Sequence, residues 1–350
     1  MKLRAVGSLA LAMLCGALPA LAQTGPGETP VDPDRFYGWV DTSFQSVGLA
    51  PVEDFGFQAV TPGPGLGGSE RHDPRLSGYG LSAGVGYRLD EGVLPAAFGS
   101  NVRIELSGHY VDASGGSTAQ SGPMTDVNLT ALPFSGNMVG IAGCGSATCF
   151  TRSSLASDYA NLGGALRIRG DFVSGAWAFT PSVGVRLSGG KVGHDLIQTL
   201  FVNGAPYPVL PPNLMQFGMN SRIDWLDYGV ELGGDLSFRV TDAVSLGLKG
   251  TLGVVNRSAS VSATSTLFFG ASVPVVTTIG AKDTHLAAVA NLEANLSVRL
   301  AANLVATGFA GLNYDSGVVG LAAPAIGVPA HLRFDPATSY YAGAALKASF

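Results

Sequence analysis

The sequence predicts an all-β protein whose strands close into an antiparallel up-and-down barrel of about ten strands, with eight or twelve also compatible. Three observations support this fold class. Short segments alternate between apolar and polar residues, which is the period of a strand rather than of a helix. Charged residues make up only 13% of the 350-residue chain, whereas a soluble protein carries about a quarter. Short and long connections follow one another between the segments, as they do between the hairpins of a barrel.

Residues 1–22 predict a cleavable signal peptide. Lys2 and Arg4 form a short positive region, and an apolar run over 5–18 follows. The small residues of 20–22 then supply an Ala-x-Ala cleavage site before Gln23. The apolar run is too short for a membrane helix, so a permanent helical anchor is disfavoured.

The rest of the chain predicts one domain behind a leader. Residues 23–34 are rich in Pro, Gly and Thr and predict a flexible leader, and residues 35–350 predict the barrel. No apolar run after the signal approaches the roughly 20 residues of a membrane helix. The sparse charge and the lack of long apolar runs are both explained if the outward side of each strand faces lipid. In hydrocarbon every backbone N–H and C=O must be paired, so a sheet has to close on itself.

Ten segments show the alternation. The clearest covers 78–89, where apolar side chains point one way and Gly, Ser and Arg point the other, with Tyr79 and Tyr87 near opposite interfaces. Pro181 interrupts the pattern of one segment, because proline cannot donate to a ladder. The predicted strands are 36–45, 78–89, 101–111, 158–169, 176–188, 225–240, 244–254, 286–300, 304–313 and 340–350.

The connections between these strands predict which end of the barrel is which. The short turns are 90–100, 169–176, 240–244 and 300–304. The long loops are 48–77, 112–157, 189–224, 256–285 and 315–339. Four short turns and five long loops join ten strands and leave both chain ends on the side of the short turns.

The last predicted strand carries a resemblance to a known family. Residues 340–350 alternate strictly, begin with Tyr340 and Tyr341, and end on Phe350. This ending resembles the closing strand of bacterial outer-membrane β-barrels, in which the terminal aromatic residue belongs to the signal read by the barrel assembly machinery. The resemblance implies that Phe350 is such an assembly signal and that the short turns are periplasmic and the long loops extracellular. It also implies a monomer in the outer membrane of a Gram-negative bacterium, surrounded by lipid and lipopolysaccharide.

Charged side chains on the inward faces predict a network inside the barrel. A barrel of about ten strands has a bore little wider than its side chains, so these charges should meet and pair. The residues expected in this lumen charge network are Arg88, Arg103, Glu105, Arg167, Arg169, Arg186, Asp227, Glu231, Asp235, Arg239, Lys249, Glu293 and Arg299. Two functions remain open: a structural or surface role with a filled lumen, or a narrow channel for small solutes with a slight anion preference.

An enzyme is the alternative class. Ten-stranded outer-membrane barrels include the omptin proteases, and Asp283-Thr284-His285 resembles the Asp-x-His half of their site. No second Asp-x-Asp or Asp-Asp pair is found on another long loop. We therefore expect no enzymatic activity and no cofactor, and keep an omptin-like protease using Asp283 and His285 as the alternative.

The mature chain keeps two cysteines, Cys144 and Cys149. An exported protein reaches an oxidising compartment, so a disulfide across this tight loop is expected. A metal site would need further ligands nearby, and the neighbouring sequence offers no His or further Cys.

The net charge disfavours nucleic acid as a partner. The whole chain carries −5, and removal of Lys2 and Arg4 with the signal takes it to −7. Proteins that bind nucleic acid through its phosphates are usually basic.

Overall fold

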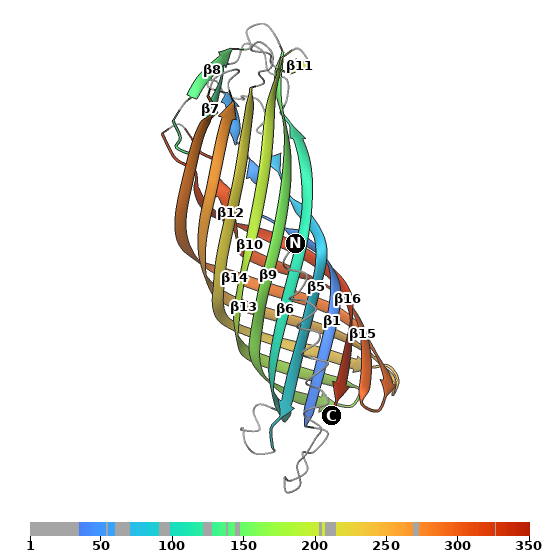
Figure 1. Cartoon of the computed structure of the whole chain (residues 1–350). Helices are drawn as coiled ribbons and strands as arrows, with labels where there is room; N and C mark the ends of the chain where they lie inside the picture. The colour runs from blue at the N-terminus through green and yellow to red at the C-terminus, as the bar shows by residue number, and fades with distance from the viewer. Residues whose placement is uncertain are drawn as a thin grey trace, which may run out of the picture.

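The computed structural model describes residues 35–53, 55–59, 71–90, 99–121, 128–137, 139–143, 148–202, 205–206, 215–268, 273–325 and 327–350. The predicted signal peptide and leader, 1–22 and 23–34, lie outside the described residues. Long antiparallel strands dominate the described chain and form one tall barrel (Figure 1). Among the described residues, no helix has the length and apolar character needed to cross a membrane.

Ten of the described strands form a closed ring. They follow one another around the ring in chain order, each antiparallel to the next. The last strand pairs back with the first, from Tyr37–Ser349 to Ser46–Tyr340, which closes the sheet. The ring strands are β1 (Phe36–Gly48), β5 (Arg75–Arg88), β6 (Ser100–Gln120), β9 (Cys149–Ser174), β10 (Trp177–Val202), β12 (Gln216–Arg239), β13 (Val244–Phe268), β14 (Val275–Ala301), β15 (Leu304–Ala322) and β16 (His331–Ser349). The prediction of an antiparallel up-and-down barrel of ten strands is confirmed.

Short strands lie at one end of the barrel, here called the upper end. Figure 1 shows β7, β8 and β11 there, whereas the C-terminus and the turns that join β9 to β10, β12 to β13 and β14 to β15 lie at the opposite, lower end. Two small sheets form within the long connections, one from β2 and β4 and one from β3, β7 and β8. These elements are β2 (Val52–Glu53), β3 (Gly56–Ala59), β4 (Arg71–His72), β7 (Asn128–Leu132), β8 (Val139–Gly143) and β11 (Ala205–Pro206).

The ring strands are much longer than the sequence predicted. β9, β10, β12, β13 and β14 contain between 24 and 27 residues each. The predicted loop over 189–224 is largely a ladder between β10 and β12, which continues upward to the pair Thr199–Gln216. Strand residues also occupy parts of the other four predicted long loops. The sequence interpretation placed the upper limit of each strand too low. At that level the apolar side of the strand passes from the outer face of the barrel to the inner face.

β13 shows this change of sides within one strand. In its lower part Leu248 and Leu252 point outward and are 48% and 69% exposed. In its upper part Val255 and Val261, at positions of the opposite parity, point inward and are 0% and 4% exposed. Because successive side chains of a strand alternate between faces, a shift of one residue moves the apolar side from the outer wall to the interior.

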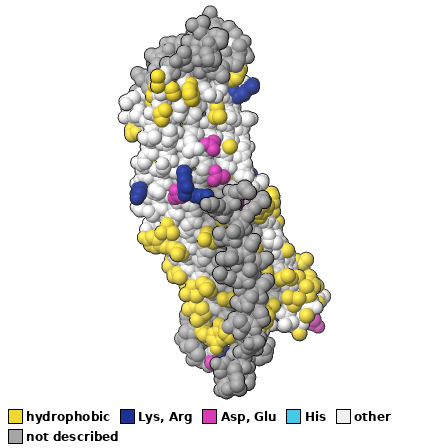
Figure 2. Space-filling view, viewed as in Figure 1, with side chains coloured by type: hydrophobic (Ala, Val, Ile, Leu, Met, Phe, Trp, Pro, Cys, Tyr) yellow, Lys and Arg dark blue, Asp and Glu magenta, His cyan; other side chains and the backbone are white. Residues whose placement is uncertain are grey.

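The same reversal occurs on β10 and β12. Leu187 of β10 and Leu232 of β12 are exposed on the lower outer wall, whereas Leu200 and Phe217 are fully buried in the upper interior. Figure 2 shows hydrophobic side chains gathered over the lower part of the visible face and most of the visible charged side chains above them. The lower part of the barrel therefore has an apolar outer wall. The upper part has a polar outer wall and an apolar interior, as β-structures in water have.

Aromatic side chains mark both borders of the lower outer wall. Exposed aromatic residues at its upper border are Phe44, Tyr79, Tyr228, Tyr314 and Tyr340, and those at its lower border are Phe36, Phe172, Trp177 and Phe350. We call the outer wall between these borders the apolar band. On β16 the band runs from Tyr340 to Phe350, which suits the roughly 9–11 residues of a tilted strand that crosses a bilayer. Aromatic girdles of this kind are typical of membrane β-barrels.

The interior of the upper barrel is a packed apolar core. Phe217 and Ile223 of β12 are fully buried there, and the connections contribute Phe55 and Phe134, whose rings meet edge to face at 6.0 Å. Gly56 has a φ of +85°, and a Cβ at this position would collide with Gln198 and Phe217. Segments of the β1–β5 and β6–β9 connections therefore fold into the mouth and fill it.

Candidate functional site: the barrel lumen

The lower lumen is built around Glu105 of β6. Its side chain accepts a hydrogen bond from the Tyr37 hydroxyl at 3.0 Å and pairs with Arg169 at 3.1 Å. Arg167 lies 3.7 Å away on the same side. Glu105 is only 3% exposed, so its charge depends on these partners.

Two arginines of β9 reach across a neighbouring strand. Arg167 pairs with Glu231, and Arg169 pairs with Asp235, although both carboxylates belong to β12 and β10 lies between the strands. Below them, Arg103 of β6 pairs with Asp171 of β9 at 3.0 Å. These ion pairs tie β6, β9 and β12 together through the interior of the barrel rather than along its wall.

A second group of charges lies higher in the lumen. Arg257 of β13 pairs with Asp227 of β12 at 2.6 Å and with Asp315 of β15 at 2.8 Å. It also donates to the carbonyl oxygen of Gly317. The side chains of Arg257 and Asp227 are 5% and 4% exposed, so this group forms a buried clamp between three strands.

Polar contacts continue on the side of β14 and β16. The Tyr341 hydroxyl donates to Glu293 at 3.0 Å and accepts a hydrogen bond from Asn291 at 2.6 Å. Acidic and basic side chains therefore lie side by side around much of the ring, from β6 through β9, β10, β12 and β13 to β14.

The structure places the residues of the predicted network in three groups. The first group has side-chain partners in the lumen and consists of Arg103, Glu105, Arg167, Arg169, Asp227, Glu231, Asp235 and Glu293. Arg186 and Lys249 line a cavity without a salt bridge to any described residue. Arg88, Arg239 and Arg299 lie exposed at the lower ends of β5, β12 and β14, outside the network.

Some lumen residues were missed in the sequence. Arg257 and Asp315 fell into segments assigned to loops, although the alternation continues through both. Tyr37 lies near the start of the predicted strand 36–45, and Asp171 fell into the predicted short turn 169–176, which belongs largely to β9. The continuing period of two residues, with its apolar side reversed, is the signal that could have identified the first pair.

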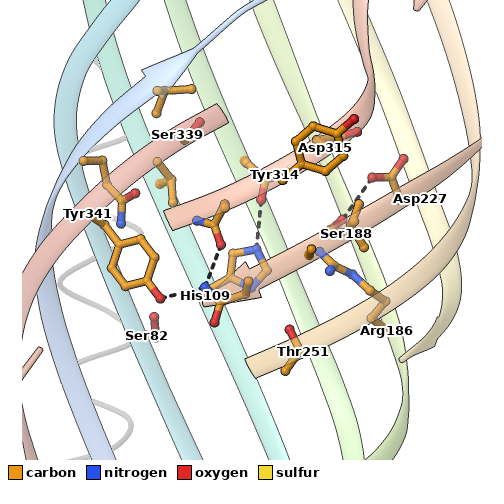
Figure 3. A pocket seen from close by; sticks show the side chains of 18 of the residues that line it. Ser82, His109, Arg186, Ser188, Asp227, Thr251, Tyr314, Asp315, Ser339 and Tyr341 are labelled. Atoms are coloured by element: carbon orange, nitrogen blue, oxygen red, sulfur yellow. Dashed lines mark hydrogen bonds between the residues drawn. The ribbon is translucent and has the colours of Figure 1, made fainter. Parts of the chain in front are cut away.

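A cavity of about 350 Å³ lies between the two groups of ion pairs. Polar and charged side chains line it toward the lower end, including Asp41, Arg186 and Lys249. Figure 3 shows His109, Arg186 and Thr251 directed into the same space. Apolar side chains such as Val192 and Trp225, which belong to the upper core, form its roof. A separate cavity of about 200 Å³ at the lower mouth is lined by residues including Arg239 and Arg299.

The Asp-x-His pair of the protease alternative lies on the upper part of β14. Asp283 is exposed and accepts a hydrogen bond from the backbone N–H of Thr284 at 2.7 Å. The His285 ring stacks on Phe334 with a centroid distance of 4.5 Å. Within the described residues no hydrogen bond joins Asp283 to His285. Arg257, the register partner of His285, already binds Asp227 and Asp315.

The predicted disulfide falls partly outside the described residues. Cys149 begins β9 and is 1% exposed, but Cys144 is not among the described residues. The disulfide therefore stays a prediction. In the described part of the chain, no group of three or more His, Cys, Asp or Glu side chains could hold a metal ion.

Comparisons with known proteins return solved bacterial outer-membrane proteins of low similarity. No protein-family model and no curated protein sequence matches the chain. The outer-membrane protease OmpT of Escherichia coli is similar in structure, with a TM-score of 0.46 and 11% identity over 93% of this chain and 100% of that chain. A FadL homologue of Pseudomonas aeruginosa has a TM-score of 0.28 and 8% identity, over 91% of each chain. An outer-membrane channel of Pseudomonas putida F1 has a TM-score of 0.30 and 9% identity, over 94% of this chain and 100% of that chain. These likenesses are too weak to indicate a function.

Proposed function

We propose that this protein is an integral β-barrel of a Gram-negative outer membrane with a closed lumen and a structural or surface-exposed role. The apolar band with its two aromatic borders supports the membrane position, because lipid requires an apolar outer wall of this height. The polar outer wall of the upper barrel suits exposure to water outside the membrane.

The filled lumen is the observation that carries the structural role. Glu105, Asp227, Glu231 and Arg257 are each no more than 5% exposed, and each is paired with a residue on another strand. Buried ion pairs of this kind are costly to break, since removal of one partner leaves a desolvated charge. Above them the apolar core seals the upper barrel. A narrow channel remains the second candidate, supported by the two cavities at either side of the lower network.

Conductance in planar lipid bilayers tests the closed lumen. We expect the unmodified protein to give no steady channel current, because ion pairs occupy the lumen at the level of the apolar band. Replacing both members of one pair, Arg167→Ala with Glu231→Ala, removes side-chain volume without leaving an unpaired charge. Combined with Phe55→Ala and Phe134→Ala, which remove the side chains that fill the mouth above, this change should produce a measurable current. The matched control replaces Arg222 and Asp224, an exposed ion pair on the outer wall, by alanine and should stay silent. A steady current from the unmodified protein would support the narrow channel instead.

The resemblance of the closing strand supports a monomer that is assembled through Phe350 and contacts outer-membrane lipid and lipopolysaccharide. Phe350 points outward at the lower border, and its backbone N–H donates to Phe36 at 2.8 Å. We assign no catalytic role to Asp283 and His285. Peptide cleavage by the purified protein that is abolished in Asp283→Asn and His285→Ala would restore the protease alternative.

A further inference from the structure

The cavity between the two groups of ion pairs has a polar lower wall and an apolar roof. We propose that it binds a single-chain zwitterionic amphiphile, with the head group between Arg186 and Asp41 and the chain along the roof. This inference goes beyond the structural role and is independent of whether the lumen conducts.

Arg186 supplies the positive side of the site. It lies on the inward face of β10, and Figure 3 shows it directed into the cavity. It forms no hydrogen bond or ion pair with any described residue. The nearest carboxylates on β12, Asp227 and Glu231, are already held by Arg257 and Arg167. A half-buried guanidinium without a partner is unfavourable, so an anionic group from a ligand would be stabilising there.

Asp41 supplies the negative side. It lies on β1, with β5, β6 and β9 between it and the strand of Arg186, so the two charges face the cavity from different walls. Asp41 lies opposite Ser82, its register partner on β5, and forms no ion pair within the described residues. Lys249 acts electrostatically on Asp41, and it also faces Glu293, its register partner on β14. Two carboxylates therefore share one ammonium group, which leaves this wall with an excess negative charge.

Aromatic side chains favour a particular cation beside Asp41. Trp39, Phe309 and Tyr341 line the cavity on the same side of the barrel, from β1, β15 and β16. Aromatic faces attract quaternary ammonium groups strongly. A head group that combines a phosphate with a quaternary ammonium matches both walls and adds no net charge to the lumen.

The roof of the cavity suits an alkyl chain. Val47, Val192 and Val319 line it and are 6%, 2% and 5% exposed, and Trp225 adds an aromatic surface. A volume of about 350 Å³ is at the lower end of the range for ligand pockets. The cavity therefore has room for one head group and part of one chain, not for a lipid with two chains.

The cavity lies at the level of the upper border of the apolar band. The backbone ladder between β14 and β15 ends at Val289–Asp315, and just above it the Ala288 N–H donates to the Ser316 hydroxyl at 2.8 Å. Ala290 and Tyr314, the last pair but one of this ladder, both line the cavity. Tyr314 is 40% exposed and belongs to the upper border of the apolar band. The site is therefore at the depth of the bilayer surface, where amphiphiles gather.

Short-chain amphiphiles with different heads test the proposal on the full chain in maltoside detergent. The probes are hexylphosphocholine, hexyl sulfate, hexyltrimethylammonium and hexyl glucoside. The variant Trp177→Phe leaves Trp39 and Trp225, which both line the cavity, as fluorescent reporters. We expect hexylphosphocholine to bind saturably and at least about tenfold more tightly than the other probes, since only it satisfies both charged walls. Arg186→Gln and Asp41→Asn should each weaken this binding about tenfold.

Arg222→Gln is the control, because Arg222 lies exposed on the outer wall beside Asp224 and should leave the affinity unchanged. Equal affinity for all four probes, preference for a singly charged head, or partitioning without saturation would overturn the proposal. If a cavity variant does not fold, the comparison of head groups on the unmodified lumen decides alone. Conductance measurements report on the closed lumen separately, so failure of one proposal is distinguishable from failure of the other.

Discussion

At the scale of single residues, the inward charges were visible in the sequence but their partners were not. The alternation places Arg167, Arg169 and Glu105 inside any barrel that has an apolar outer wall. Their pairing with Glu231 and Asp235 skips over β10, and such contacts depend on the bore and the tilt of the closed sheet. No local sequence pattern carries that information.

His194 gives the clearest pH dependence at this scale. It points into the upper core, is 4% exposed, and its Nδ1 lies 2.8 Å from the Ser157 hydroxyl. Burial lowers the pKa of His194 to about 4, because charging the ring there means desolvating it. The unfolded chain therefore binds more protons between pH 4 and pH 6.5, and stability should fall as the pH drops through this range, by about 3 kcal/mol at most. Urea unfolding in lipid vesicles from pH 4.5 to 8 measures this slope. His194→Gln should flatten it, and an unchanged slope would assign the effect to other groups.

At the scale of the strand, the sequence predicted the existence of all ten ring strands but not their length. The interpretation assumed that apolar residues always face outward, so each strand seemed to end where that pattern stopped. In β13 the pattern does not stop at Val254 but passes to Val255 on the other face. One strand therefore turns its apolar side outward below and inward above. In the proposed membrane position, this reversal marks the membrane surface.

Two arginine substitutions on the outward face of β10 test this reversal. Val183 and Ile197 are similarly exposed, at 42% and 50%, but Val183 lies within the apolar band and Ile197 lies above it. We expect Val183→Arg to cost about 2–4 kcal/mol, because it places a charge in the hydrocarbon. Ile197→Arg should change stability by less than about 0.5 kcal/mol, since its side chain is in water. Reversible unfolding in lipid vesicles measures both, and equal costs would place the membrane border elsewhere.

At the scale of the whole molecule, the two halves of the barrel are held together by different forces. In the proposed membrane position, the lower half is stabilised by the bilayer around its apolar band and by the ion pairs in its lumen. The upper half has an apolar core of its own, closed by Phe55 and Phe134 from the connections, and does not need lipid to bury it. Continuous strands join the halves, so their coupling is a property of the ring rather than of any one residue.

Two tryptophans at different levels can measure this coupling. Trp177 lies at the lower border of the apolar band. Trp225 lies in the upper interior, where its ring covers Gly190 and packs against Tyr159. With Trp39 replaced by Phe, a further Phe substitution at either position leaves one reporter. Urea weakens the burial of apolar groups from water but does not remove the bilayer around the lower half. We therefore expect the Trp225 signal in lipid vesicles to change at a lower urea concentration than the Trp177 signal. Detergent micelles are the control, because they hold the apolar band less firmly and should bring the two transitions closer. Coincident transitions in lipid would mean that the barrel unfolds as one cooperative unit, with the upper core transmitting its stability through the full length of the strands.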